Sequence, residues 1–380
     1  MQFPFKHSAT GTTIFTVMSA LAAEYKAINL SQGFPDFAID QTLASLLEEA
    51  ARGNFNQYAP MPGLPMLRES IAADLSGRYG ISADPDTEIT ITPGATYGIY
   101  TALASFLQRG DEVIVLEPAY DSYIPNIEMN GAVAVPVALS YPGFNVDWNA
   151  VKRAVTSKTK AIIINTPHNP TGAVGSQADW DELAELVRET DIVIVSDEVY
   201  EQLIFDGKKH FSVLQHAELK QRSFAVFSFG KVFNNTGWKI GYVVAPPPMT
   251  AAFRHIHQYL SFSVNSTAQY AIARYLEMGS LPDVGRVMES KRNYFLELFK
   301  QLPFTIKSPT AGSYFQLAGY EQISDMADVD FAKWLTKEHG VATIPLSPFY
   351  SAKKDNRLIR FCFAKKEETL QAAAEKLKAI

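Results

Sequence analysis

The sequence has 380 residues, of which 47% are hydrophobic, 12% aromatic and 19% charged. This composition is typical of a folded globular protein and excludes disordered and collagen-like chains, while the length exceeds a typical domain of about 150 residues, so two lobes are expected. The net charge of −6 includes no long block of like charges, which argues against a nucleic-acid surface and favours small-molecule partners.

Cysteine content and hydropathy indicate the cellular compartment of the protein. Cys362 is the only cysteine, so an internal disulfide and a thiolate metal cage are both excluded. The first residues contain no apolar stretch of signal-peptide length, and no later run approaches the ~18 apolar residues that cross a bilayer. We therefore predict a cytoplasmic protein that does not contact a membrane.

The N-terminal part is too short to form a core of its own. A helix is expected near residues 13–24, followed by the segment INLSQGFPDF. This part must dock on another lobe.

Seven short, β-branched runs follow in the middle of the chain. They are EITIT, EVIVL, VAVPV, AIIIN, DIVIVS, SFAVFS and WKIGYVV, and helix-period segments separate them. Near-continuous apolar strands of this kind are typical of a mainly parallel sheet covered by helices on both faces. One crossover helix carries apolar residues at 99, 102, 103, 106 and 107 and is expected to end at Gly110. The predicted fold is α/β, with a seven-stranded sheet in a three-layer αβα arrangement.

The pattern changes after about residue 275. A long helical stretch, SYFQL, a helix around Trp334 that ends at Gly340, the strand RLIRFCF and a last amphipathic helix indicate an α+β lobe. We assign residues 40–275 to a large domain, and residues 1–39 together with 276–380 to a small domain.

Chemically versatile residues follow the ends of several predicted strands. AIIIN leads into Asn169, DIVIVS into Asp197 and Tyr200, SFAVFS into Lys231, and EITIT into PGAT at 93–96. Ligands of open α/β sheets bind at the carboxyl ends of the strands, so these residues are expected to converge.

Each of these residues also has a purely structural interpretation. Ala95 and Thr96 could belong to an ordinary turn with a threonine cap, Asp197 could cap a helix or bind an arginine, and most lysines lie on the surface. Lys231, however, stands in the charge-poor segment SFGKVFNNTGWKIGY, where a desolvated amine loses its proton and becomes a nucleophile. The sequence contains neither a Walker A motif nor a GxGxxG after a strand, which disfavours nucleoside triphosphates and dinucleotides.

An amine, an acid, an amide, a phenol and an anion-binding turn together suit pyridoxal phosphate. This cofactor needs a lysine for its aldehyde, a carboxylate for its ring nitrogen, donors to its 3-oxygen and a phosphate cup. The sequence indeed resembles the fold-type I pyridoxal-phosphate aminotransferases of classes I and II. The similarity rests on the order and spacing of NPTG at 169–172, SDEVY at 196–200, SFGK at 228–231, GWKIGY at 237–242 and the arginine of RLIRFCF. INLSQGFPDF, NQYAP, EPAYDSY and IPLSPFY resemble the branch that contains methionine aminotransferase and the kynurenine and glutamine transaminases.

The resemblance implies which residues bind the cofactor. Lys231 would bind the aldehyde and serve as the base, Asp197 would pair with the ring nitrogen, and Tyr200 would bind the 3-oxygen. The remaining cofactor contacts would come from Asn169 at the 3-oxygen, from Tyr120 stacked on the ring, and from a phosphate cup of Ala95, Thr96, Ser228, Lys239 and a second subunit's Tyr58. Many relatives have arginine where this chain has Lys239. Lysine keeps the positive charge but cannot form the two parallel hydrogen bonds that a guanidinium donates to a phosphate.

The resemblance also implies a substrate site and a dimer. Arg360 would bind the substrate α-carboxylate with help from Asn169 and Gly33. The alternation in RLIRFCF places Arg360 on a face with Leu358 and Cys362, an apolar setting for a guanidinium. The pocket walls would be Phe15, Tyr58, Tyr120 and Phe349. His255 and His257 are interpreted as structural residues, and no metal is expected.

These implications lead to a predicted activity. A homodimeric aminotransferase would move the amino group of methionine and aromatic amino acids to a 2-oxo acid by a ping-pong mechanism. Phe262 and Ser263 stand where dicarboxylate-specific relatives carry a second arginine, which favours an apolar pocket. Two alternatives stay open: a cysteine-conjugate β-lyase that uses the same cofactor, and an amino-acid binding protein without catalysis.

Overall fold

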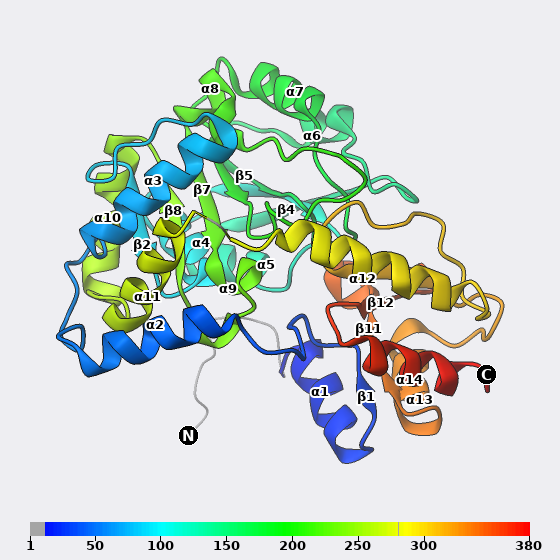
Figure 1. The fold of residues 1–380 in the computed structure, drawn as a ribbon. Coiled ribbons are helices and arrows are strands. Elements are labelled where there is room, and N and C mark those ends of the chain that lie inside the picture. Colours follow the sequence, from blue (N-terminus) through cyan, green and yellow to red (C-terminus); the bar gives the residue numbers. More distant parts are fainter. Residues whose placement is uncertain (1–11, 280) are drawn as a thin grey trace, which may run out of the picture.

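A seven-stranded sheet forms the centre of the larger part of the molecule in the computed structural model, which describes residues 12–279 and 281–380 (Figure 1). Its strand order is β2-β8-β7-β6-β5-β3-β4. Neighbouring strands are parallel except β8, which is antiparallel to both β2 and β7. The strands are β2 (Ile89–Thr92), β3 (Glu112–Glu117), β4 (Val133–Ala138), β5 (Thr159–Asn165), β6 (Val193–Asp197), β7 (Ser223–Ser228) and β8 (Gly241–Val244). The predicted α/β fold with seven mainly parallel strands is confirmed.

Helices cover both faces of this sheet. Along β3, Val113 and Val115 pack in one core with α4 (Ala95–Ala104), α5 (Tyr123–Met129) and α10 (Pro247–Leu260). The alternate residues Ile114 and Leu116 belong to the core on the other face. The helices of that core include α2 (Gln41–Arg52), α3 (Pro65–Tyr79), α6 (Trp148–Ala154), α7 (Gln177–Val187), α8 (Ala217–Lys220) and α11 (Ser266–Glu277).

One predicted helix end is wrong. Helix α4 ends at Ala104, well before the expected stop at Gly110. The hydroxyl of Ser105 donates to the carbonyl of Ala102 at 2.7 Å, a local bond that competes with further helix. Gly110, with φ +89°, lies instead in the turn that precedes β3.

The beginning and the end of the chain lie together in a smaller group of elements. Figure 1 shows α1 (Ile14–Glu24) and β1 (Ile28–Asn29) beside α13 (Asp328–Glu338) and α14 (Glu367–Leu377). Strand β1 pairs in parallel with β10 (Val341–Ala342), and an antiparallel sheet runs in the order β11-β12-β9. Its strands are β11 (Ile344–Pro345), β12 (Leu358–Cys362) and β9 (Phe315–Gly319). The domain boundaries at residues 39/40 and 275/276 stay predictions.

Helix length and hydropathy decide whether a helix of the described part of the chain could cross a membrane. Helix α12 (Val284–Phe299), with 16 residues, exceeds the others described in length. Within residues 12–279 and 281–380, no helix combines the length and the apolar character that crossing a membrane requires.

Candidate active site

A cavity of about 420 Å³ lies where β5, β6 and β7 end and α4 begins. Residues of α1, β9 and β12 close its other side, so both groups of elements contribute walls. Every predicted site residue except Tyr58 and Phe349 lines this cavity: Phe15, Gly33, Ala95, Thr96, Tyr120, Asn169, Asp197, Tyr200, Ser228, Lys231, Lys239 and Arg360.

Lys231 enters the cavity from α9 (Phe229–Val232), the short helix that directly follows β7. Its Nζ donates to the carbonyl oxygen of Gly33 at 3.3 Å, and the rings of Tyr200 and Tyr314 both lie 5.8 Å away. Burial lowers the pKa of Lys231 to about 8. The amine can therefore lose its proton close to neutral pH, as a nucleophile or a general base must.

Asp197 is the last residue of β6 and its carboxylate is held on both oxygens. Oδ2 accepts a 2.6 Å hydrogen bond from the hydroxyl of Tyr123, and Oδ1 accepts from the backbone N–H of Val199 at 3.3 Å. Burial raises the pKa of Asp197 to about 6, although both hydrogen bonds oppose this shift. A cationic ligand atom beside the carboxylate would stabilise its ionised form.

A turn with a glycine of positive φ precedes α4. Gly94 has φ +86° there, and a Cβ at this position would lie 2.9 Å from Lys239 Nζ. No side chain caps α4, which leaves the N–H groups of its first turn available, and Ala95, Thr96 and Ser228 all line the cavity. A helix N-terminus beside an ammonium group suits a phosphate.

Arg360 projects from β12 and is only 1% exposed. Its Nη1 donates to Asn169 Oδ1 at 2.8 Å and its Nη2 to the carbonyl oxygen of Ser31 at 2.9 Å, while the ring of Phe315 lies 3.8 Å from Cζ. Burial lowers its pKa to about 10, so it stays charged at neutral pH. Nε has no partner and no ion pair forms with any described carboxylate, which suits a carboxylate ligand.

The aromatic residues and Gly33 shape the space between these groups. The ring of Tyr120 lies 6.4 Å from that of Phe15, and burial raises the pKa of Tyr120 to about 12. Tyr200 is buried edge-on against Tyr314, 5.1 Å between ring centroids. A Cβ on Gly33 would lie 2.7 Å from Phe315, so close packing excludes a side chain there.

Tyr58 and Phe349 lie outside the lining of the cavity. Tyr58 is 84% exposed and its ring contacts Phe262, which is also exposed. Phe349 packs edge-on against Phe15 at 5.7 Å and so supports the wall from behind. The prediction that Tyr58 completes a second subunit's site stays a prediction.

Three residues of the site were missed in the sequence. Tyr123 binds Asp197 and begins α5, three residues after Tyr120 in EPAYDSY. Asp121 also lines the cavity, and burial raises its pKa to about 6, an effect that the charge of Arg360 opposes. Asn165 donates to the carbonyl of Asp197 and accepts from the N–H of Asn169, so it ties the two loops together.

The histidines near these loops form structural bonds. His168 is buried and its Nδ1 lies 2.7 Å from the hydroxyl of Thr171. His257 bonds to Tyr97 through Nδ1 at 2.9 Å. Over residues 12–279 and 281–380, no three His, Cys, Asp or Glu side chains cluster so that they could hold a metal ion.

Comparison with known proteins decides the family. The family model described as aminotransferase class I and II matches residues 25–377. The chain belongs to the class I and II aminotransferases. It is 46% identical over 375 residues to methionine aminotransferase of Escherichia coli K12, covering 97% of this chain and 96% of that protein. It is 34% identical over 394 residues to rat kynurenine–oxoglutarate transaminase 1, covering 94% and 93%.

A solved structure agrees with this family assignment. The crystal structure of YbdL from Escherichia coli, whose report identifies a methionine aminotransferase function, superimposes with a TM-score of 0.97 at 44% identity and covers 100% of both chains. As an aminotransferase, this enzyme acts on an amino acid and a 2-oxo acid. The predicted family and enzyme class are confirmed.

Proposed function

We propose that this aminotransferase uses pyridoxal phosphate to move the amino group of methionine and aromatic amino acids to a 2-oxo acid. The observation that carries the proposal is the meeting of Lys231, Asp197 and Arg360 in one cavity from α9, β6 and β12, respectively. The names of the two relatives, one acting on methionine and one on kynurenine, support the choice of amino donors.

The residues present fit the cofactor. Lys231 offers an amine of lowered pKa for the aldehyde, and Asp197 offers a buried carboxylate for the ring nitrogen. A guanidinium only donates hydrogen bonds, so Asn169 turns its Oδ1 toward Arg360. The Nδ2 of Asn169 is then left as a donor for the 3-oxygen of the cofactor, together with the hydroxyl of Tyr200. The phosphate would be held by Ala95, Thr96, Ser228 and Lys239, and by Tyr58 of a second subunit.

When bound, pyridoxal phosphate supplies an aldehyde that bonds to amines and a protonated ring that accepts electrons. The chain's own residues then place the amino acid and move its protons. Arg360 binds the α-carboxylate and so fixes the Cα relative to the cavity. Lys231, as a neutral amine, takes the proton from Cα and later returns one. Asp197 keeps its negative charge toward the ring, and the aromatic walls exclude water.

Substrate choice follows from the walls of the cavity. Phe15, Tyr120 and Phe315 present apolar surface, and Arg360 is the only arginine among the described lining residues. A donor with a second carboxylate therefore finds no second guanidinium, and the two lysines of the lining, Lys231 and Lys239, are assigned to the cofactor. Apolar and aromatic side chains gain from burial against these rings.

An amino-donor panel tests the proposal. The purified protein, loaded with pyridoxal phosphate, is assayed with one fixed 2-oxo acid and with methionine, phenylalanine, kynurenine, glutamine and aspartate as donors. Methionine and the aromatic donors should give the highest kcat/KM, and Lys231→Ala should abolish turnover. Lys208→Ala, at an exposed lysine, is the control.

Three outcomes would overturn parts of the proposal. Aspartate turning over far better than methionine would contradict the apolar pocket. Release of pyruvate and ammonia from a thioether amino acid without any 2-oxo acid would favour the β-lyase alternative. A Lys231→Ala enzyme that keeps wild-type turnover would contradict the chemistry itself.

A further inference from the structure

Tyr123 and Asp197 form a short hydrogen bond inside the candidate active site. The hydroxyl of Tyr123 donates to Oδ2 of Asp197 at 2.6 Å, and both residues line the cavity. Tyr123 begins α5 and is buried, and its ring packs in the core that also holds Val195, two residues before Asp197 on β6. The packing of this ring fixes the hydroxyl at the end of the strand.

Tyr123 meets the ionised carboxylate as a neutral donor. Burial raises the pKa of Tyr123 well above its ordinary value, and the negative charge of Asp197 adds to this rise. The phenol therefore keeps its proton at neutral pH, where an ionised carboxylate can only accept hydrogen bonds.

Few groups hold the carboxylate of Asp197. The backbone N–H of Val199 donates to Oδ1 at the longer distance of 3.3 Å, and among the described residues Tyr123 is the only side chain that donates to this carboxylate. Burial raises the pKa of Asp197 to about 6, and the bond from Tyr123 is the largest of the effects that oppose this rise. Removing the hydroxyl would therefore make Asp197 a stronger base.

The titratable residues that share the cavity do not replace this donor. Burial raises the pKa of Tyr120 to about 12 and also raises that of Tyr200, so both stay neutral at neutral pH. The charge of Lys231 lowers the pKa of Asp197, but in the loaded enzyme this amine would bind the cofactor's aldehyde. Tyr123 is therefore the side-chain donor that stays beside Asp197 when the cofactor is bound.

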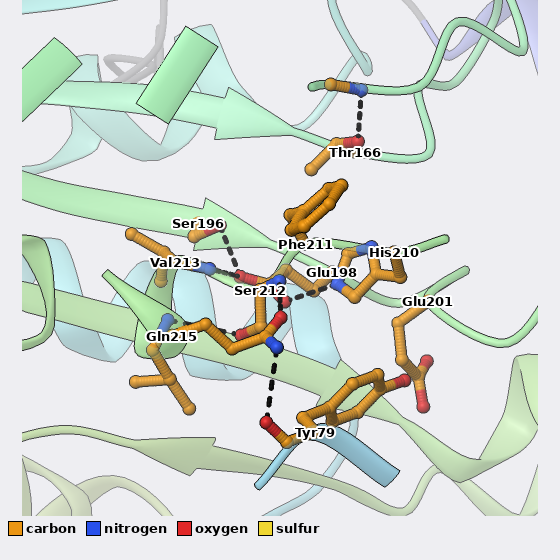
Figure 2. A network of polar contacts seen from close by, with 12 residues as sticks. Tyr79, Thr166, Ser196, Glu198, Glu201, His210, Phe211, Ser212, Val213 and Gln215 are labelled. Atoms are coloured by element: carbon orange, nitrogen blue, oxygen red, sulfur yellow. Dashed lines mark hydrogen bonds and ion pairs between the residues drawn. The ribbon is translucent and has the colours of Figure 1, made fainter. Parts of the chain in front are cut away.

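Glu198, the next residue in the chain, is engaged elsewhere. Unlike Asp197, it does not line the cavity. Its Oε1 accepts from the hydroxyl of Ser196 at 2.8 Å and from the backbone N–H of Val213 at 3.0 Å, and its Oε2 lies 2.7 Å from Nε2 of His210. Figure 2 shows these contacts around Glu198. The bond from Tyr123 thus acts on Asp197 alone.

We propose that Tyr123 is a positioning residue that keeps a proton on the cofactor's ring nitrogen, because its bond to Asp197 stabilises the carboxylate as an anion. Asp197 and the ring nitrogen would share one proton, which stays with the stronger base. In a buried site, the neutral pair of carboxylic acid and pyridine competes with the ion pair, since desolvation disfavours both charges. The inference rests on the proposed function, in which the protonated ring accepts electrons.

Three variants test the inference: Tyr123→Phe, Asp197→Asn and the double variant. Each is loaded with pyridoxal phosphate that carries a nitrogen isotope label in its ring, and the NMR chemical shift of that atom distinguishes a protonated from a neutral ring nitrogen. Tyr123→Phe should move the signal from the protonated position of the wild type toward the neutral one. Adding Tyr123→Phe to Asp197→Asn should not move it further, because Tyr123 acts through the carboxylate.

Single-turnover kinetics with the best amino donor of the panel follow the same logic. The rate at saturation should fall by about 10- to 150-fold in Tyr123→Phe, the size expected for one hydrogen bond to a charged group. The donor concentration at half-saturation should not change, since Tyr123 does not hold the substrate. Tyr320→Phe, at a buried tyrosine whose hydroxyl donates to the carbonyl of Met326 at 2.8 Å, is the control and should leave both readouts unchanged.

Urea unfolding of the cofactor-free proteins gives a readout without the cofactor. The stability that protonated Asp197 contributes is lost as the pH rises through its pKa in the folded state. In Tyr123→Phe this loss should end about one pH unit higher than in the wild type, because the folded carboxylate has become the stronger base. In the Asp197→Asn background, Tyr123→Phe should cause no such shift.

Separate outcomes decide the inference and the proposed function. A wild-type ring-nitrogen signal in Tyr123→Phe, or equal effects of this substitution with and without the carboxylate of Asp197, would overturn the inference. If Tyr123→Phe unfolds, a folded double variant would support the coupling and an unfolded one would overturn it. A wild-type protein that gains no cofactor absorption would contradict the proposed function, and the pH dependence of unfolding would still decide whether Tyr123 acts on Asp197.

Discussion

Asn169 and Arg360, 191 residues apart, meet through a 2.8 Å hydrogen bond from Nη1 of the arginine to Oδ1 of the asparagine. Asn169 stands in the loop after β5, and Arg360 stands on β12 in the other sheet. The bond thus joins the two groups of elements at the cavity. It also orients a buried guanidinium whose Nε has no partner toward the space that a substrate carboxylate would fill.

Replacing Arg360 by lysine should weaken substrate binding selectively. Lysine keeps the charge but loses the planar fork, a charge-assisted interaction of about 1.5 to 3 kcal/mol. We expect kcat/KM for methionine to fall by about 10- to 150-fold, mainly through KM, with the absorption of the bound cofactor retained. Steady-state kinetics measure kcat and KM of the variant. The control is Arg357→Lys, the same substitution at a half-exposed arginine near the start of β12. An unchanged KM would exclude Arg360 as the carboxylate ligand.

The buried acid of the site should make the cofactor-free protein sensitive to pH. Burial raises the pKa of Asp197 to about 6 in the folded state, above the ordinary value of 3.8 for an exposed aspartate. The folded state binds the proton of Asp197 more tightly than the unfolded state does, so protonation of Asp197 contributes to the free energy of unfolding. This contribution is fully present below pH 3.8 and is lost as the pH rises through 6. Asp197→Asn should therefore exceed the stability of the wild type by about 1 kcal/mol at pH 4.5 and by up to about 3 kcal/mol at pH 8.

Urea unfolding of the cofactor-free wild type and Asp197→Asn at both pH values measures this difference. Asp191→Asn, at an exposed aspartate just before the same strand, should show no such pH-dependent gain. A variant that is less stable than the wild type at pH 8 would mean that Asp197 stabilises the apoprotein as an anion.

Asp121 should discriminate against donors with a second carboxylate. It lines the cavity, and above its pKa of about 6 its negative charge repels such a group. Asp121→Asn should raise the ratio of kcat/KM for glutamate to that for glutamine by about tenfold at pH 7.5. In the wild type the same ratio should rise as the pH falls to 5.5. A ratio unaffected by both the substitution and the pH would place Asp121 away from the donor side chain.

The exposure of Tyr58 predicts a contact with a second copy of the chain. An aromatic ring that is 84% exposed, beside the exposed ring of Phe262, is typical of a protein interface. The enzyme should sediment as a dimer, and Tyr58→Phe should lower the affinity for pyridoxal phosphate without changing sedimentation. Tyr141→Phe, at another exposed tyrosine, is the control. A fully active monomer would contradict the shared site.

The sequence predicts the strands of the main sheet well, because most of the apolar runs form strands buried on both faces, the edge strand β4 excepted. It does not predict that β8 runs antiparallel to β2 and β7, since an apolar run carries no direction. The end of α4 was also missed, because a single bond from Ser105 to Ala102 decides it.

In the site, too, residues that directly follow strands could be predicted, whereas contacts with distant segments of the chain could not. Asn169, Asp197 and Lys231 were placed together because each follows a strand of one sheet. The partner of Asp197 was not predicted, because Tyr123 precedes it by 74 residues and reaches it only through the packing of α5. The pair of Glu198 and His210 likewise depends on the path of the loop between them.

Chemical labelling of Lys231 tests the central claim most directly. The protein is loaded with pyridoxal phosphate, treated with borohydride to fix the cofactor to its amine, digested and analysed by mass spectrometry. The account predicts one modified peptide, with the cofactor's mass on Lys231, and none in Lys231→Ala. A label on another lysine, or no label on a coloured protein, would contradict it.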